Sequence, residues 1–175
     1  MPGPSGAADG GKLEQREDLT AETDSFLKQA EDLLASSPTN LPEALTLLAS
    51  IEKRLRMGND TPNLVRVCEA SVQHCHDAKD EERLIVTLNN LTTRRSQKSK
   101  AIGAMVAKAI TWVLISGDGK GYIPIAVETE EQKEILTKLV VALRDITDGK
   151  LFLEAERARL TRALAIIKVS CSEMH

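Results

Sequence analysis

The sequence predicts an all-α protein in which stacked antiparallel helical hairpins form a right-handed, TPR-like solenoid. Three observations predict it. Apolar residues recur at helical spacing from Thr20 onward. Hydrophobic residues make up 42% of the chain, but only one Trp, one Tyr and two Phe are among them. Strand-rich folds usually contain more aromatic residues. The breaks between periodic segments are short, which favours antiparallel neighbours. The segments do not match a consensus tetratricopeptide repeat, and a compact bundle is the alternative architecture.

Composition argues against several classes of protein. The net charge of −3, from 23 basic and 26 acidic residues, gives no general attraction to nucleic acid or anionic lipid. No apolar run reaches the roughly 18 residues that span a bilayer. The opening MPGPSGAADGGK lacks the apolar core of a secretory signal, and three cysteines do not make a paired disulfide framework. We expect a soluble protein of the cytoplasm and nucleus, without nucleic-acid or membrane partners.

The first half of the chain predicts a tail and four helices. Residues 1–18 are rich in Gly, Pro, Ala and charge, so we expect a disordered N-terminal tail. Pro42 suits a first helical turn, and Gly58 is a plausible stop. Thr61 is the expected N-cap of the third helix, and Asp80 that of the fourth. The four helices are expected at 20–36, 42–57, 61–78 and 81–92.

The second helix has a charged residue, Glu52, next to its apolar stripe. Leu48, Ile51 and Leu55 form its apolar stripe, and Glu52 is expected to point outward, away from the core.

The second half predicts three helices and one loop. A fifth helix is expected at 96–115, followed by a flexible loop at 116–126. Thr129 and Gln132 have the spacing of a capping box for a sixth helix that ends near Ile146. Asp148 is the expected cap of the seventh helix, which ends near Lys168. We therefore expect a helical-repeat domain at 19–168 and a separate tail at 169–175.

The stretch CEASVQHCH resembles a metal-binding cluster at first sight. Cys68 and Cys75 lie seven residues apart, which is about 10 Å along a helix. A zinc ion requires sulfur ligands at about 2.3 Å, so one ion does not reach both thiols along an intact helix. His74 and His76 point to different sides. We expect core thiols and surface histidines, with no metal and no cofactor.

The Gly-rich stretch GDGKGY, residues 117–122, raises the alternative of a nucleotide-binding enzyme. Lys120 is followed by Gly121 and Tyr122 rather than Ser or Thr, and Pro124 opposes a helix start, so the Walker pattern fails. The dinucleotide-binding glycine pattern also fails. The preceding TWVLIS is a candidate strand, which keeps this alternative open. A flexible connection is the preferred interpretation.

Four cations crowd the stretch RRSQKSK, which begins at Arg94 and Arg95. No aromatic residue is interleaved to stack on bases, so a solvated helix entry or a protein contact is favoured over nucleic-acid binding. The chain also shows no Ser, His and Asp constellation. We therefore predict no catalytic residues and no small-molecule substrate.

The seventh helix places charge inside an apolar stripe. Leu160 and Leu164 fall on one arc of the helix with Leu153 and Ile167, and Glu156 and Arg157 land within that arc. Glu154 with Arg157, and Glu156 with Arg159, are spaced to pair on the helix surface. Buried pairs seldom add stability but can fix register. This pattern favours a face that meets another helix or another chain.

The same stretch carries a family resemblance. GKLFLEAERARLTRALAIIK, residues 149–168, closely resembles the 26S proteasome non-ATPase regulatory subunit 12 family, whose members are regulatory-particle lid subunits of the PCI type. LLASIEKRLR at 47–56 and RRSQ at 94–97 match in the same order and at similar spacing. The resemblance covers roughly 19–168 and is strongest in the last helix.

The resemblance implies a non-catalytic scaffold that serves ubiquitin-dependent protein degradation. Its implied partners are other lid subunits and subunits of the base or core particle. The implied candidate interface residues are Glu154, Glu156, Arg157, Arg159, Arg94 and Arg95. Two alternatives share the helical architecture: a COP9 signalosome subunit and a generic helical-repeat adaptor.

The chain departs from the family pattern in two places. The loop at 116–126 looks longer than the family connection, and the family continues beyond Lys168 through more repeats and a PCI module. This ending predicts an alternative transcript or a truncated gene model. Such a chain is expected to bind lid neighbours weakly and to be largely absent from intact 26S particles.

Overall fold

The computed structural model describes residues 16–119 and 121–173, in which helices dominate and one short hairpin interrupts them. The expected tail at 1–18 lies mostly outside these residues. The α-helices are α1 Thr20–Ser36, α2 Leu41–Met57, α3 Thr61–Asp77, α4 Glu81–Thr93, α5 Ser99–Ile110, α6 Glu130–Thr147 and α7 Glu154–Ser172. Two 3-10 helices, η1 Pro38–Asn40 and η2 Leu151–Leu153, precede α2 and α7, and strands β1 Leu114–Gly117 and β2 Gly121–Pro124 lie between α5 and α6.

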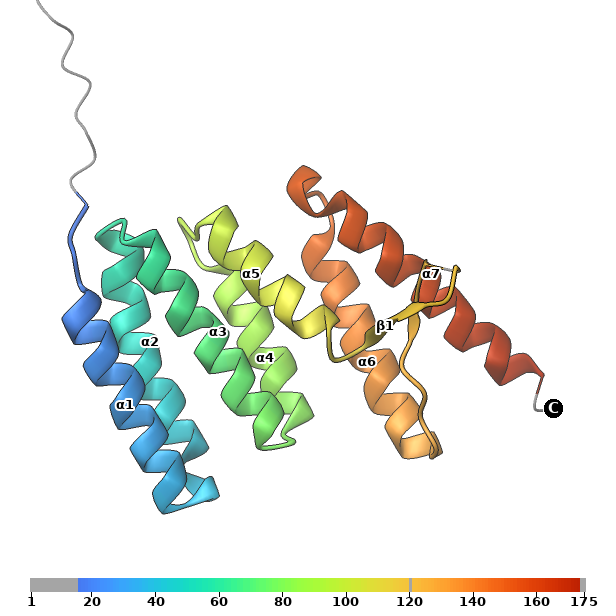
Figure 1. Cartoon of the computed structure of the whole chain (residues 1–175), viewed down its shortest axis with the longest axis horizontal. Coiled ribbons are helices and arrows are strands. Elements are labelled where there is room, and N and C mark those ends of the chain that lie inside the picture. Colours follow the sequence, from blue (N-terminus) through green and yellow to red (C-terminus); the bar gives the residue numbers. More distant parts are fainter. Residues whose placement is uncertain (1–15, 120, 174–175) are drawn as a thin grey trace, which may run out of the picture.

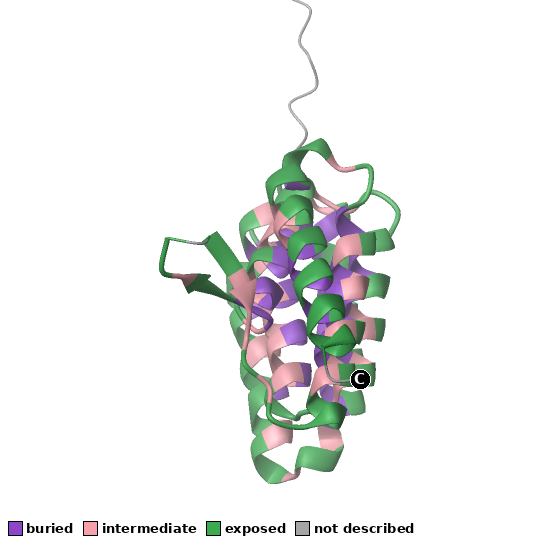
Figure 2. Cartoon of the chain, turned by 90° about the vertical axis from the view of Figure 1, so that its right-hand side faces the viewer, coloured by how far each residue is buried: buried purple, intermediate pink, exposed green. Residues whose placement is uncertain are grey.

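The helices stand side by side and alternate in direction, as Figure 1 shows. Helix α1 packs on α2, α2 on α3, and α3 on both α4 and α5, while α6 packs on α4 and α7. Buried residues form one largely aliphatic core cluster, and the end-on view of Figure 2 shows buried segments facing the inside between the helices. The all-α prediction of stacked antiparallel helices is confirmed, and the right-handedness of the solenoid stays a prediction. None of the described helices combines the length and the apolar character needed to cross a membrane.

Several helix ends lie where the sequence predicted them, because the capping groups are in place. Thr129 accepts a hydrogen bond from the amide of Gln132, and the Gln132 side chain accepts one from the amide of Thr129, which completes the capping box of α6. Asp80 accepts a hydrogen bond from the amide of Arg83 at the start of α4. These side chains satisfy amide groups that have no partner within the helix.

The expected cap of α3 was wrong by one residue. Asp60, not Thr61, is the N-cap, and its carboxylate is fully buried. It accepts hydrogen bonds from the Asn63 side chain at 2.7 Å and from the Leu19 amide at 3.0 Å, and Arg16 lies 3.5 Å away. One carboxylate therefore joins the start of α3 to the segment before α1.

Three other boundaries were also misplaced. Helix α5 ends at Ile110 rather than 115, because the chain turns at Thr111 and then enters a strand. Asp148 is the C-cap of α6, and α7 begins after η2 with Leu153 in its N-cap position. Helix α7 then continues through the boundary expected at Lys168 and ends at Ser172.

The segment expected as a loop at 116–126 contains an antiparallel hairpin. Ile115 pairs with Ile123, and Ser116 pairs with Tyr122. Gly119 and Gly121 adopt φ values of 67° and 73°, a conformation that glycine adopts without strain. Strand β2 packs on α7, and an isolated two-stranded hairpin needs such support to be stable.

Candidate interaction surfaces

The predicted stripe of α7 faces the core, and its charges lie at the surface. Leu160 is 0% exposed and Leu164 is 5% exposed, whereas the Arg157 side chain is 50% exposed. Glu154 is exposed and Glu156 is half-buried. Helix geometry therefore placed the apolar residues correctly, but it did not bury the charges that share their arc.

The charges of α7 bind partners other than the expected ones. The Arg157 guanidinium lies 3.0 Å from the Asp148 carboxylate at the end of α6, an exposed pair that closes the α6–α7 corner. The Arg159 guanidinium lies over the Tyr122 ring, 4.2 Å from its centroid, and links α7 to β2. Among the described residues, no ion pair joins Glu154 to Arg157 or Glu156 to Arg159. Both arginines thus hold α7 to its own neighbours within the chain.

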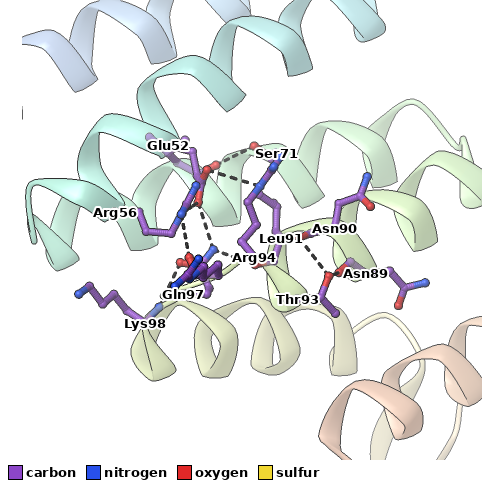
Figure 3. Close-up of polar contacts among 12 residues, drawn as sticks. Glu52, Arg56, Ser71, Asn89, Asn90, Leu91, Thr93, Arg94, Gln97 and Lys98 are labelled. Carbon is purple, nitrogen blue, oxygen red and sulfur yellow. Dashed lines mark hydrogen bonds and ion pairs between the residues drawn. The ribbon is translucent and has the colours of Figure 1, made fainter.

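Arg94 and Arg95 lie where the chain leaves α4, beside a buried charge that the sequence reading placed outward. Glu52 on α2 is only 1% exposed, so the outward prediction was wrong. Its carboxylate accepts a hydrogen bond from Arg56 Nε at 2.9 Å and one from Gln97 Nε2 at 3.2 Å, and Arg94 Nε lies 3.7 Å away (Figure 3). We call Glu52, Arg56, Arg94 and Gln97 the Glu52 cluster.

The Glu52 cluster fixes the α4–α5 connection onto α2. Arg56, itself 7% exposed, also donates to the Arg95 carbonyl at 2.8 Å. Gln97 donates to the Leu91 carbonyl at 2.8 Å. Arg94 therefore contacts the protein's own interior, as the protein-contact interpretation of RRSQ allowed, although within one chain. The i,i+4 spacing of Glu52 and Arg56 was the available sequence signal for this pair.

The cysteines of α3 occupy the core as predicted, but the histidines are less exposed than expected. Burial, reinforced by the nearby Glu52 carboxylate, raises the pKa of Cys68 to about 12. Burial also raises the pKa of Cys75. His76 is half-buried and stacks on Trp112 with ring centroids 4.0 Å apart and planes 5° from parallel. Among the described residues, no three His, Cys, Asp or Glu side chains are grouped to hold a metal ion.

The Gly-rich stretch forms the turn of the hairpin. A phosphate loop requires its glycines to lead directly into a helix N-terminus. Here β2 follows the turn, and the next helix, α6, begins only at Glu130. This geometry does not support the nucleotide-binding alternative.

Sequence reasoning missed an apolar surface on the hairpin and α7. Ile115 and Tyr122 on the hairpin are 48% and 38% exposed, and Ile166 and Val169 on α7 are 38% and 58% exposed. Ile123, the cross-strand neighbour of Ile115, lines the same pocket as Ile166. We call the exposed residues Ile115, Tyr122, Ile166 and Val169 the hairpin–α7 surface, in which Ile115 and Tyr122 lie on opposite faces of the hairpin because successive strand residues alternate. The sequence signal was the mismatch between the short apolar strands and the helical period around them.

This architecture of adjacent antiparallel helices defines an all-α helical-repeat protein. The family model described as PSMD12/CSN4, N-terminal, matches residues 43–174, which is more than half of the chain. The chain belongs to this family. The matched range includes most of the segment expected as a separate tail at 169–175.

Individual relatives agree with the family match. The chain is 31% identical to the 26S proteasome non-ATPase regulatory subunit 12 homolog A of Arabidopsis thaliana and 32% identical to the 26S proteasome non-ATPase regulatory subunit 12 of Dictyostelium discoideum. It is 30% identical to the 26S proteasome regulatory subunit rpn501 of Schizosaccharomyces pombe. Each alignment spans 117 residues, 67% of this chain and 23% of the relative. The chain thus matches less than a quarter of the length of these relatives.

Proposed function

We propose that this chain is a non-catalytic helical-repeat segment that takes part in assembling the regulatory-particle lid of the 26S proteasome. The observation that carries the proposal is the family match over residues 43–174, together with relatives named as proteasome regulatory subunits. Lid subunits are the proposed partners, with base and core-particle subunits as further contacts. The proposed location is the cytoplasm and nucleus, where ubiquitin-dependent degradation takes place.

The surface proposed for these contacts is the hairpin–α7 surface. It exposes apolar side chains, and the cations Arg162 and Lys168 lie on the same helix. Apolar patches with polar surroundings are typical of protein interaction sites. The six residues predicted from the sequence are proposed only as supports of this surface, because Arg157 and Arg159 position α7 and Arg94 contacts the interior.

Cross-linking mass spectrometry of the tagged chain, expressed at its endogenous level, tests this function. We expect cross-links from Lys133, which lines the pocket beside the surface, and from Lys168 on α7 to regulatory-particle subunits, because covalent capture also records the weak contacts expected outside intact 26S particles. Ile166→Asp with Val169→Asp should abolish these links. Val86→Asp, at another exposed apolar residue on α4, is the matched control and should keep them.

Cross-links to COP9 signalosome subunits alone would favour the alternative assembly, which the family description also names through CSN4. Cross-links to neither assembly would contradict the proposal.

A further inference from the structure

A groove of about 670 Å³ lies between the α3–α4 turn and the start of α6, and it shares Ile125, Val127 and Leu136 with the pocket beside the hairpin–α7 surface. The α3–α4 turn and the first turn of α6 both lie at the lower edge of Figure 1. Leu136 and Leu139 of α6 form part of the groove lining, and both are buried. Ile125 and Val127, in the segment after the hairpin, are half-buried and line it too.

The groove has a fixed aromatic wall. His76 and Trp112 both line it and stack on each other at 4.0 Å, so each ring limits the movement of the other. The segment after the hairpin is held in place by a hydrogen bond of 2.9 Å from the Ile125 amide to the Val113 carbonyl. A preformed apolar recess of this size accepts one or two side chains with little loss of conformational freedom.

The rim of the groove is negatively charged. Asp77 and Glu81 line it on one side, with Lys79 as the only cation among the described lining residues. Val127 and Gln132 line the other side, and the stretch between them contains three exposed glutamates. These glutamates are Glu128, Glu130 and Glu131.

Helix dipoles offset only part of this charge. The N-termini of α4 and α6 each supply about half a positive charge, and the C-terminus of α3 supplies about half a negative charge. Counted over the same stretches, Lys79 and Lys133 offset two of the five carboxylates, so an excess of three remains and the rim stays negative after this correction.

We infer that this groove binds a short linear peptide of another protein, in which Lys or Arg residues flank one aliphatic or aromatic anchor. The anchor packs against Trp112, Val127 and Leu136, and the basic side chains lie over the rim glutamates. Charge complementarity selects a basic peptide over an acidic one and speeds the encounter. The inference does not need the proteasome assembly role, because it rests on the lining and charge of the groove and not on the family match.

Selection from a random peptide library on the immobilised protein tests the inference. Enriched sequences should place Lys or Arg on both sides of an apolar residue. They should bind poorly to Val127→Asn, which puts an uncharged polar side chain into the groove. Absence of enrichment over this variant, or enrichment without basic residues, would overturn the inference.

An enriched peptide without Trp is then titrated against the protein. Trp112 is the only tryptophan of the chain, so its emission reports directly on the groove. Glu128→Gln with Glu130→Gln and Glu131→Gln should weaken binding at least about 5-fold and reduce its salt dependence, since rim charges act through screened attraction. Glu31→Gln with Glu43→Gln and Glu154→Gln removes the same charge from three exposed sites elsewhere and should change affinity less than about 2-fold.

Equal losses in the two triple variants would mean that only net charge matters, which contradicts a built groove. All substituted glutamates are exposed, so both variants should fold, and circular dichroism verifies this. Light scattering tests whether a second copy of the chain occupies the groove. A dimer that dissociates in Val127→Asn would assign the groove to self-association and overturn the peptide inference.

Discussion

The α1–α5 region contains a buried ion pair, whereas the described ion pairs of the α6–α7 region lie at the surface. Glu52 and Arg56 on α2 have side chains that are 2% and 7% exposed. Arg157 and its partner Asp148 are 50% and 68% exposed. Glu52 and Arg157 were each part of an amphipathic pattern in which helical spacing alone suggested the opposite burial. The position of a charge on its own helix therefore did not decide its burial.

The burial of a charged side chain depends on how many hydrogen-bonding and ion-pair partners other helices and connections supply. Glu52 Oε1 accepts hydrogen bonds from Arg56 on its own helix and from Gln97 on the α4–α5 connection, and the Arg94 guanidinium lies 3.7 Å from Oε2, so two cations and an amide surround the buried charge. Arg157 meets only the end of α6. A buried charge requires several such partners, because its desolvation costs several kcal/mol.

The largest expected effect comes from breaking the Glu52 cluster. Arg56→Ala removes the closest partner of a buried carboxylate and should lower the free energy of unfolding by about 3–5 kcal/mol. Urea unfolding followed by circular dichroism measures it. The double variant Glu52→Leu with Arg56→Met removes both charges and should be clearly more stable than Arg56→Ala alone. A double variant as unstable as the single one would show that packing, not the unpaired charge, causes the loss.

A second effect, of about 2 kcal/mol at neutral pH, is expected at the buried cap of α3. Asp60→Asn keeps a capping oxygen but gives up charged hydrogen bonds to the Leu19 amide and Asn63. Burial opposes ionisation of Asp60, but the hydrogen bonds from Asn63 and Leu19 and the charge of Arg16 outweigh it, so its pKa lies below the usual 3.8. Unfolding curves of parent and variant at several pH values measure the difference.

The sign of the pH dependence follows from that lowered pKa. The native state holds the Asp60 proton less tightly than the unfolded state, so its contribution is complete above pH 3.8 and is lost as the pH falls through the native pKa. The difference between parent and Asp60→Asn should therefore shrink in acid. A difference that stays constant down to pH 2 would rule out the charge as its source.

The exposed cap of α6 provides the matched comparison. Thr129→Ala removes one oxygen of the capping box and should cost about 1 kcal/mol, less than Asp60→Asn, because water replaces the lost partner. Thermal unfolding of the two variants side by side measures the order. A larger loss at Thr129 would invert the comparison between the buried and exposed caps.

The smallest effect is expected at the exposed ion pair. Arg157→Ala should cost less than about 1 kcal/mol, since exposed pairs contribute little. Glu130→Ala, at an exposed position of α6, is the control and should change stability within roughly 0.5 kcal/mol. Denaturant unfolding of both measures it. If Arg157→Ala lowered the free energy of unfolding as much as Arg56→Ala, the exposed and buried ion pairs would contribute equally and the comparison between the two regions would fail.

Local signals in the sequence predicted most of the fold. The bounds of α1 agree with the structure, and so does the capping box of α6, because it depends on side chains within one turn of the helix. The hairpin was missed, since strands of four residues carry little periodicity and β2 depends on packing against α7.

The interaction surfaces were harder to predict. Apolar burial on α7 follows helical spacing, so Leu160 and Leu164 were placed correctly. Glu52 was misplaced because its partners Arg94 and Gln97 are distant in sequence. The hairpin–α7 surface depends equally on segments that only the fold brings together. Predictions that need non-local pairing therefore require the structure.

The buried thiols of α3 allow local unfolding around this helix to be followed by the rate of cysteine alkylation. Cys68 and Cys75 are both 0% exposed, and burial raises both pKa values, so neither thiolate meets an alkylating reagent in the closed state. Cys171, near the end of α7, is exposed and reacts without opening. The ratio of slow to fast alkylation in one sample therefore gives the fraction of molecules in which α3 has separated from its neighbours. Each chain thus contains both the reporter of local opening and its internal standard.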